Sequence, residues 1–267
     1  MNFLNQFKER NQLIKEWIYE AAETIKKSFD AELDIQQKSN RNDLVTNMDK
    51  AIERHFIEKI HHSFPGERIL GEEGFGDAVD SLDGVVWIID PIDGTLNFIK
   101  QQDDFAIMIA VYENGEGQLG YIYDVMQDKL YAAQVGEGAS CNGKQLSPIK
   151  DTSLKEGLVA ISSALMSEET GLARTVGRAS SGVRLIGSAG IETVHVASGR
   201  LVAYLAASLA PWDIAAGKVI AEEVGLVYTK LNGDKIDLLQ KNPSLVATPT
   251  AHQEIVDLLN SNGKSYM

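Results

Sequence analysis

Apolar residues recur at helical spacing in two segments of the first sixty residues. In the second segment they stand four positions apart, at Met48, Ile52, Phe56 and Ile60. Residues three or four apart share one face of an α-helix, so the pattern predicts amphipathic helices over 3–29 and from 48 to the break at 64–66. The polar stretch between them, residues 36–42, is expected to be a linker. The first helix is indicated by Phe3, Phe7, Ile14, Ile18, Ala21 and Ile25.

Strand patterns dominate from residue 68 to about 145. A short apolar run predicts a strand at 68–71, and the acidic, glycine-rich segment 74–84 predicts a surface loop. Asn114-Gly115 and Asn142-Gly143 are typical of hairpin turns. Four longer strands are predicted from alternating or continuous apolar runs at 85–89, 105–112, 118–124 and 128–135.

After residue 150 the pattern alternates between strand and helix. The predicted strands are 157–162, 184–186, 201–205 and 244–247, and the predicted helices are 167–178, 188–198, a helix from Asp213, and 250–260. The first half is therefore α+β and the second α/β, with helices layered on sheets. We expect an N-terminal lobe over 1–150 and a C-terminal lobe over 151–267, packed as one compact catalytic unit.

Composition narrows the function classes. The chain has 267 residues, 44% of them hydrophobic, and a net charge of −13. Such an acidic protein is a poor partner for nucleic acid, and it suits an anionic substrate only where bound cations reverse the local charge. The lone Cys141 cannot form an internal disulfide. With no apolar stretch of about 20 residues and with charges at Lys8, Glu9 and Arg10, we expect a cytoplasmic protein without a membrane contact.

The segment WIIDPIDGTLNF, residues 87–98, carries the most specific chemistry. An apolar strand ends in Asp90, Pro91 stiffens the turn, and Asp93 follows three residues on. Gly94 allows a ligand to approach the backbone, and Thr95 begins a predicted helix whose free amides favour phosphate oxygens. Two carboxylates at a strand end, next to a place for phosphate, are the environment that Mg²⁺ prefers.

Each acidic residue of this candidate site also has a plain structural interpretation. Asp49 and Asp213 each stand near the start of a helix and could be simple caps. Glu72 and Glu73 follow the short strand and could form a solvated turn. A haloacid-dehalogenase-type phosphatase, which forms an aspartyl-phosphate, is a rival enzyme class. Its aspartates are two positions apart, whereas Asp90 and Asp93 are three apart and lie behind two helices.

Taken together, these motifs resemble the inositol monophosphatase family, a group of Mg²⁺-dependent, lithium-sensitive sugar-phosphate phosphatases related in fold to fructose-1,6-bisphosphatase. The resemblance covers nearly the whole chain. It rests on Gly71-Glu72-Glu73, on residues 87–98, on WDIAAG at 212–217, and in support on Asp43-Leu44-Val45-Thr46 before Asp49. It implies an αβαβα layered sandwich, which is an α+β fold, and a homodimer that acts on a small phosphomonoester.

The resemblance also implies roles for individual residues. Two or three Mg²⁺ ions per subunit would be held by Glu72, Asp90, the carbonyl of Ile92, Asp93 and Asp213. Asp49, Glu72 and Thr95 would be catalytic: Thr95 and Asp49 would orient and deprotonate the attacking water, and Glu72 would reach it through metal. The implied substrate-binding residues are Lys38, Asp93, Gly94, Thr95, Ser188, Ala189 and Asp213. Arg184 could reach the substrate or cap a strand, so it is added to this set.

Substrate choice is less determined than the chemistry. The animal members of the family carry a glutamate seven residues before the aspartate that corresponds to Asp213, and this chain has Ala206 at that position. A site without that hydroxyl-binding group discriminates less among polyols, so we hypothesise a broadened range that includes fructose-1,6-bisphosphate or the 2′-phosphate of NADP. The non-enzymatic alternative is an inactive phosphate-ligand or partner-binding module of the same fold. The intact set Glu72, Asp90, Asp93 and Asp213 argues against it.

Overall fold

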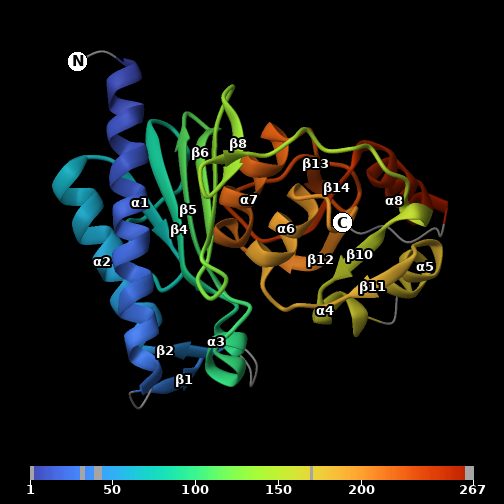
Figure 1. The fold of residues 1–267 in the computed structure, drawn as a ribbon, viewed down its shortest axis with the longest axis horizontal. Coiled ribbons are helices and arrows are strands. Elements are labelled where there is room, and N and C mark those ends of the chain that lie inside the picture. Colours follow the sequence, from blue (N-terminus) through green and yellow to red (C-terminus); the bar gives the residue numbers. More distant parts are fainter. Residues whose placement is uncertain (1–2, 31–33, 39–43, 169–170, 262–267) are drawn as a thin grey trace.

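The computed structural model describes residues 3–30, 34–38, 44–168 and 171–261. Its elements stack as helices, sheet, helices, sheet, helices (Figure 1). In that view α1 and α2 lie at the left, α6 and α7 lie between the two sheets, and α5 and α8 lie at the right. The αβαβα arrangement implied by the family resemblance is therefore confirmed. Among the described residues, no helix is both long and apolar enough to cross a bilayer.

The first outer layer is the helix pair α1 (Phe3–Lys27) and α2 (Asn47–Ser63). Both bury an apolar stripe against the first sheet, with Ile18 of α1 and Phe56 of α2 fully buried. Helix α2 begins with a capping box: the Thr46 hydroxyl accepts from the amides of Met48 and Asp49, and the Asp49 carboxylate accepts from the Thr46 amide. The helical spacing found in the sequence is thus confirmed for both helices.

The first sheet has seven strands in the order β3-β4-β5-β6-β7-β8-β9. Its side chains alternate between the two faces. In β5, Ile107 and Ile109 face α1 and α2, whereas Met108 and Ala110 face the middle layer. The strands are β3 (Arg68–Gly71), β4 (Val85–Asp93), β5 (Ala106–Glu113), β6 (Glu116–Asp124), β7 (Lys129–Gln134), β8 (Gly138–Cys141) and β9 (Lys144–Gln145).

The middle layer consists of α6 (Ala189–Ala197) and α7 (Pro211–Glu223), which pack between the two sheets. Small residues let these helices come close to their neighbours. A side chain on Gly120 of β6 would meet the Ala216 carbonyl of α7 at 2.6 Å, and one on Gly217 would meet Thr193 of α6 at 2.8 Å. This close packing brings the start of α7 next to the end of β4, where the acidic residues lie.

The second sheet has five strands in the order β11-β10-β12-β14-β13 and is covered on its outer side by α4, α5 and α8. Leu165, Val176 and Ile255, one from each of these helices, are buried against it. The strands are β10 (Leu158–Ile161), β11 (Gly182–Arg184), β12 (Ala203–Leu209), β13 (Val227–Lys230) and β14 (Asn242–Ala247), and the helices are α4 (Ser163–Met166), α5 (Leu172–Ala179) and α8 (Pro249–Ser261).

Several boundaries differ from the sequence prediction. Residues 36 and 37, expected in a linker, belong to β1 (Ile35–Gln37), which pairs antiparallel with β2 (Leu44–Thr46). A strand was expected at 184–186, but β11 ends at Arg184. Strand β13 was not predicted, and one expected helix, 167–178, is replaced by α4 and α5. These elements are short, with 3 to 8 residues each, so local periodicity is a weak signal for them.

Candidate active site

A break in strand register places Asp90 and Asp93 on one face of β4. Opposite them on β5 stand Met108 and Ala106, so three steps along β4 match two along β5. Such a bulge reverses the usual alternation of a strand. Because of it, Asp90 and Asp93, three residues apart, both lie on the middle-layer side, while Ile92 is buried on the α1–α2 side. The Asp-Pro-Ile-Asp spacing thus directs both carboxylates into the same site.

Asp213 joins this pair from the first turn of α7. The helix begins with Pro211, and the Asp213 carboxylate accepts from the Ala210 amide at 2.7 Å. Asp213 is the third residue of α7 and the N-cap is Ala210, so the plain N-cap considered for Asp213 is wrong. One carboxylate oxygen each from Asp90, Asp93 and Asp213 lies within 4.8 Å of the others.

The three aspartates are held where ionisation is costly. Burial raises the pKa of Asp90 well above its usual range, and the charges of Glu72, Asp93 and Asp213 raise it further. Burial also raises the pKa of Asp213, with Asp93 adding to the effect. The pKa of Asp93 is raised by burial too, although hydrogen bonds from Ser188, Gly190 and Ala189 oppose the shift. Crowded carboxylates of this kind gain most from a divalent cation.

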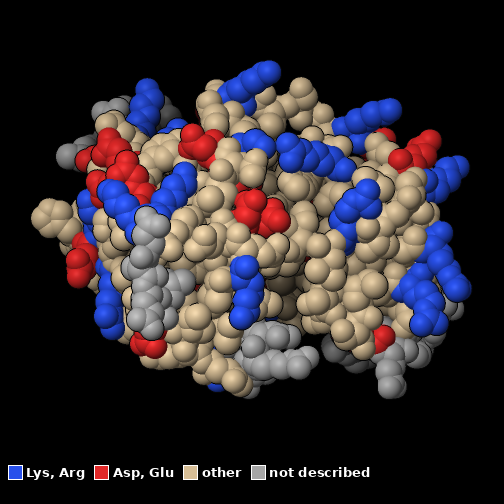
Figure 2. All heavy atoms as spheres, turned by 60° about the horizontal axis from the view of Figure 1, so that its bottom comes forward, with Lys and Arg blue, Asp and Glu red and all other residues tan. Residues whose placement is uncertain are grey.

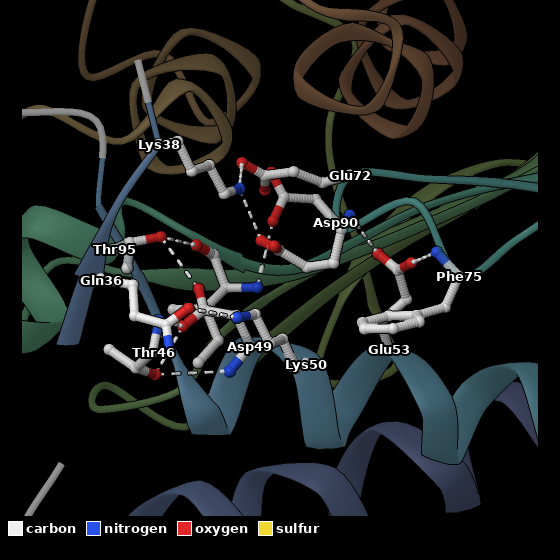
Figure 3. Close-up of polar contacts among 12 residues, drawn as sticks. Gln36, Lys38, Thr46, Asp49, Lys50, Glu53, Glu72, Phe75, Asp90 and Thr95 are labelled. Carbon is white, nitrogen blue, oxygen red and sulfur yellow. Dashed lines mark hydrogen bonds and ion pairs between the residues drawn. The ribbon is translucent and has the colours of Figure 1, made fainter. Parts of the chain in front are cut away.

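Glu72 and Glu73 reach the site from the turn after β3. Lys38 donates to Glu72 at 2.9 Å (Figure 3) and to Glu73 at 2.6 Å, and the side chains of both glutamates are largely buried. The solvated turn considered for this pair is therefore wrong. Burial alone would lower the pKa of Lys38, but the two carboxylates outweigh it and raise that pKa above its usual value. Burial raises the pKa of Glu73 to about 7.

Thr95 and Asp49 are joined by a hydrogen bond between two helix starts. Thr95 is the first residue of α3 (Thr95–Gln101), and its hydroxyl lies 3.0 Å from Asp49 Oδ1 and 3.1 Å from the Ile92 carbonyl. Figure 3 shows Asp49 rising from α2 towards Thr95. Burial raises the pKa of Asp49, although hydrogen bonds from Thr46 and Thr95 oppose the shift. A carboxylate with a raised pKa is a stronger base.

The start of α6 lies against Asp93 and closes one side of the site. The Ser188 hydroxyl donates to Asp93 Oδ2, and the amides of Ala189 and Gly190 donate to Asp93 at 3.1 and 2.7 Å. Asp93 therefore caps α6 while it faces Asp90 and Asp213. A side chain at Gly190 would approach the same carboxylate to 3.0 Å, so the helix can come this close only with a small residue there.

Of these residues, Glu72, Asp90, Asp93, Thr95 and Asp213 line a cavity of ≈ 670 Å³, whereas Lys38, Asp49, Ser188 and Ala189 lie outside its lining. Figure 2 shows the face of the molecule on which a hollow opens, with acidic side chains beside it. The described residues that line the cavity include no lysine or arginine. They are Leu44, Glu72, Asp90, Ile92, Asp93, Gly94, Thr95, Leu96, Asn97, Gln101, Asp104, Ser163, Leu185, Ile186, Gly187 and Asp213.

Not every residue expected at the site lines this cavity. Arg184 is exposed and donates to the Val183 carbonyl, one residue away. Ala206 is fully buried in the core and lies outside the cavity lining.

Gly94 lines the cavity and is in the left-handed region with φ 89°, where a glycine is strongly favoured. Asp43, quoted in support of the family resemblance, lies outside the described residues.

Three supporting residues were not singled out from the sequence. Glu53 of α2 is buried and accepts from the amides of Glu73 and Phe75 at 2.6 and 2.9 Å, which holds the turn carrying Glu72 (Figure 3). Asn97 donates to the Ile186 carbonyl and Glu192 accepts from the Ile186 amide, so both hold the loop between β11 and α6, which lines the cavity. The sequence offers one signal for Glu192, because it is a charged residue within the mostly apolar helical segment AGIETVHVA.

The donor set suits Mg²⁺. All the side-chain candidates, Glu72, Asp90, Asp93 and Asp213, offer hard carboxylate oxygens, and the Ile92 carbonyl lies in the same cavity lining. The described residues that line the cavity include no histidine or cysteine, the ligands that zinc and copper usually favour. The residues present therefore fit the metal that the family resemblance implies.

Comparison with known proteins agrees with this geometry. The inositol monophosphatase family matches residues 8–264. An inositol-1-monophosphatase of Bacillus subtilis is 47% identical over 259 residues, which cover 95% of this chain and 97% of the relative. A fructose-1,6-bisphosphatase/inositol-1-monophosphatase of Thermotoga maritima is 32% identical over 227 residues, or 85% of this chain and 86% of the relative.

A solved IMPase/NADP phosphatase, crystallised with Mg²⁺ and phosphate, superimposes with a TM-score of 0.91 at 32% identity. The match covers 98% of this chain and 100% of that one. Sequence and structure therefore agree over nearly the whole length. The chain belongs to the inositol monophosphatase family and is an inositol monophosphatase-type phosphatase, a phosphoric monoester hydrolase.

Proposed function

We propose that the protein is a Mg²⁺-dependent phosphomonoesterase that hydrolyses inositol monophosphate by direct attack of water. The observation that carries the proposal is the convergence of Asp90, Asp93 and Asp213 within 4.8 Å in a cavity large enough for a sugar phosphate. Glu72 and the Ile92 carbonyl complete the proposed ligand set for two or three ions. Bound Mg²⁺ would lower the pKa of a coordinated water and offset the charge of the phosphate.

The chain's own residues would handle the proton. The Thr95 hydroxyl can donate its single proton to Asp49 Oδ1 or to the Ile92 carbonyl. When it donates to Asp49, a lone pair of Thr95 Oγ1 can accept a hydrogen bond from the attacking water; as the water's proton moves to Oγ1, the Thr95 proton moves to Asp49, so the carboxylate is the final base. Gly94 and Thr95 would bind the phosphate through their amides. Phosphate and the free alcohol would leave without a covalent enzyme intermediate.

A broadened substrate range forms part of the proposal. Two relatives support it, because one is a fructose-1,6-bisphosphatase as well as an inositol-1-monophosphatase and the other is an IMPase that is also an NADP phosphatase. The substrate contacts proposed are Lys38, Asp93, Ser188, Ala189 and Asp213, with Arg184 as the outermost member. Ala206 lies too deep to touch a substrate in the cavity described, so its contribution would act through packing.

The remaining expectations extend this proposal. We infer a homodimer in the cytoplasm that is inhibited by lithium, as a lithium-soaked inhibitory complex of a staphylococcal inositol monophosphatase would suggest. We also infer that the lobes 1–150 and 151–267 act as one unit, because Asp90 and Asp93 come from the first and Asp213 from the second. Size-exclusion chromatography with light scattering tests the dimer, and an LiCl titration of activity tests the inhibition.

The decisive experiment is phosphate release from inositol 1-phosphate, fructose-1,6-bisphosphate, NADP⁺ and 3′-phosphoadenosine 5′-phosphate, with and without Mg²⁺. Release that requires Mg²⁺ and is lost in Asp90→Asn is expected, and the order of rates assigns the substrate. In ¹⁸O-labelled water, direct attack places the label in phosphate in the first turnover. Folded protein that releases no phosphate from any of these would favour the inactive binding module instead.

A further inference from the structure

One wall of the cavity is a short loop between β11 and α6. Leu185, Ile186 and Gly187 from this loop line the cavity. Their side chains offer no group for metal or phosphate, and Leu185 is 52% exposed. The carboxylates that would hold metal lie on β4, on α7 and in the turn after β3, and the amides that would bind phosphate lie at the start of α3. The loop therefore faces the rest of a substrate, which is its alcohol portion.

The loop is anchored from inside the protein by Glu192 of α6. The Ile186 amide donates to Glu192 Oε1 at 2.7 Å, and the Gly187 amide lies 3.4 Å from the same oxygen. Glu192 is only 1% exposed and is surrounded by buried apolar residues of α6. A carboxylate is costly to bury unless it is well hydrogen-bonded. These two amides, with the Tyr204 hydroxyl, provide that hydrogen bonding.

The opposite side of the same loop is held by the first lobe. Asn97 of α3 donates its side-chain amide to the Ile186 carbonyl at 2.9 Å and to the Asp104 carbonyl at 2.9 Å. Ile186 is thus bound at its amide by Glu192 and at its carbonyl by Asn97. Gly187 has a φ of 93°, and a side chain added there would lie 3.3 Å from the Asn97 side chain. The loop is therefore packed closely against Asn97.

We propose that Glu192 is a positioning residue that sets the shape of the cavity wall for the alcohol portion of the substrate. The proposal rests on the proposed function, since it assumes that a phosphomonoester occupies this cavity. Glu192 touches neither substrate nor metal. It acts through the amides of Ile186 and Gly187, so its loss should weaken recognition of the alcohol and leave phosphate binding and chemistry in place.

The test compares Glu192→Ala and Glu192→Gln with the wild type. For Glu192→Ala we expect KM for inositol 1-phosphate to rise about tenfold, with kcat changed less than about threefold. The lost contacts to the alcohol portion would stabilise the ground state and the transition state equally, so their loss raises KM and leaves kcat nearly unchanged. The inhibition constant of inorganic phosphate, which probes only the phosphate end, should stay within about twofold. Glu192→Gln keeps an acceptor oxygen and should restore most of the lost affinity.

Glu223→Ala is the matched control. Glu223 is a glutamate near the end of α7 that accepts from the amides of Gly136 and Gly138 at 2.9 and 2.7 Å, away from the cavity. It has the same kind of contact and should leave KM unchanged. If Glu223→Ala raises KM as much as Glu192→Ala does, or if KM and the phosphate constant rise together, Glu192 is a general stabilising residue and the proposal is wrong.

Amide hydrogen exchange gives a readout without substrate. In Glu192→Ala, exchange of a peptide covering residues 185–188 should accelerate at least about tenfold, while peptides from β4 and β5 should be unchanged. Unchanged exchange in the loop would overturn the proposal. A wild type that is inactive on inositol 1-phosphate would instead count against the proposed function, and the exchange measurement would still decide whether Glu192 holds the loop.

Discussion

Thr95 Oγ1 lies 3.0 Å from Asp49 Oδ1, and the other oxygen of the same carboxylate accepts from the Thr46 amide at 2.8 Å. Asp49 is therefore both a helix-capping residue of α2 and the partner of the candidate catalytic hydroxyl. The cap fixes the orientation of the carboxylate, so Oδ1 remains directed at Thr95. The cap considered as an alternative for Asp49 and its candidate catalytic role are thus compatible.

Replacing Thr95 by valine should abolish most activity while the fold is kept. Valine has nearly the shape of threonine but cannot transfer a proton, and removal of general-base assistance typically costs about 10²- to 10⁴-fold in rate. The measurement is kcat for inositol 1-phosphate at saturating Mg²⁺, with the melting temperature alongside.

Thr248→Val is the matched control for this substitution. It removes a hydroxyl that donates to the Thr152 carbonyl at 2.6 Å, away from the cavity, so it should cost about 1 kcal/mol of stability and leave kcat near its wild-type value. Near wild-type turnover in Thr95→Val would mean that the hydroxyl takes no part in the reaction.

Mg²⁺ should stabilise the folded protein, and more so at pH 8 than at pH 5.5. Burial and neighbouring charge raise the pKa values of Asp90 and Asp213 in the folded state. Groups with a raised folded-state pKa contribute most stability below their unfolded pKa and lose it as pH rises through the folded value. The metal-free protein therefore loses stability as these carboxylates ionise, and a cation that binds the ionised form reverses the loss.

Thermal unfolding at both pH values, with EDTA and with Mg²⁺, measures this effect. At ten times the dissociation constant the gain should be about 1.4 kcal/mol. In Asp90→Asn the gain should be largely lost, whereas Glu223→Ala should keep it. An equal gain in Asp90→Asn and the wild type would place the binding elsewhere.

Glu53→Ala should weaken Mg²⁺ activation without changing a ligand. Glu53 accepts from the amides of Glu73 and Phe75, and Gly71 lies so close that a side chain there would overlap the Glu53 carboxylate. The turn that carries Glu72 is thus built around Glu53. Loss of an outer partner of a metal ligand typically costs about 10- to 100-fold in metal affinity.

The Mg²⁺ concentration for half-maximal activity measures this prediction, with kcat at saturating Mg²⁺ as the second value. Glu53→Gln keeps an acceptor oxygen and should show a smaller shift. A drop in kcat with unchanged Mg²⁺ dependence would contradict a role in holding Glu72.

His195 should make the protein less stable in acid. Burial, with the charges of Arg200 and Lys129, lowers the pKa of His195 to about 4. Arg200 can only donate, so the His195 Nε2 that it contacts at 3.1 Å must be the unprotonated acceptor. A histidine with a depressed folded-state pKa stabilises the protein above its unfolded value of about 6.5, and the contribution disappears as pH falls towards 4.

The measurement is the free energy of unfolding in urea at pH 7 and pH 4.5. His195→Gln, which cannot be protonated, should lose about 1 kcal/mol less than the wild type over this range, after allowance for partial exposure. His62→Gln, on the exposed end of α2, should behave as the wild type. Equal losses in His195→Gln and the wild type would contradict the prediction.

Long-range contacts explain why the site could be predicted only in part. Asp90, Asp93 and Asp213 were found because their motifs are local: an apolar strand before two carboxylates, and a proline and an aspartate at a helix start. Glu192 and Asn97 were missed because each gains its role from Ile186, six residues away for Glu192 and 89 residues away for Asn97. Such partners leave no periodic pattern in the sequence.

The amino-acid sequence by itself determined the long helices, the first sheet and the acidic motifs. Periodic burial and turn chemistry act over a few residues, so these features can be read locally. Tertiary structure alone decided which carboxylates meet, because the bulge in β4 and the close approach of α7 to β6 are settled by pairing and packing between distant segments. It also decided that Asp213 lines the same cavity as Thr95 and Asp93, and that Asp49, buried behind this cavity, contacts the Thr95 hydroxyl.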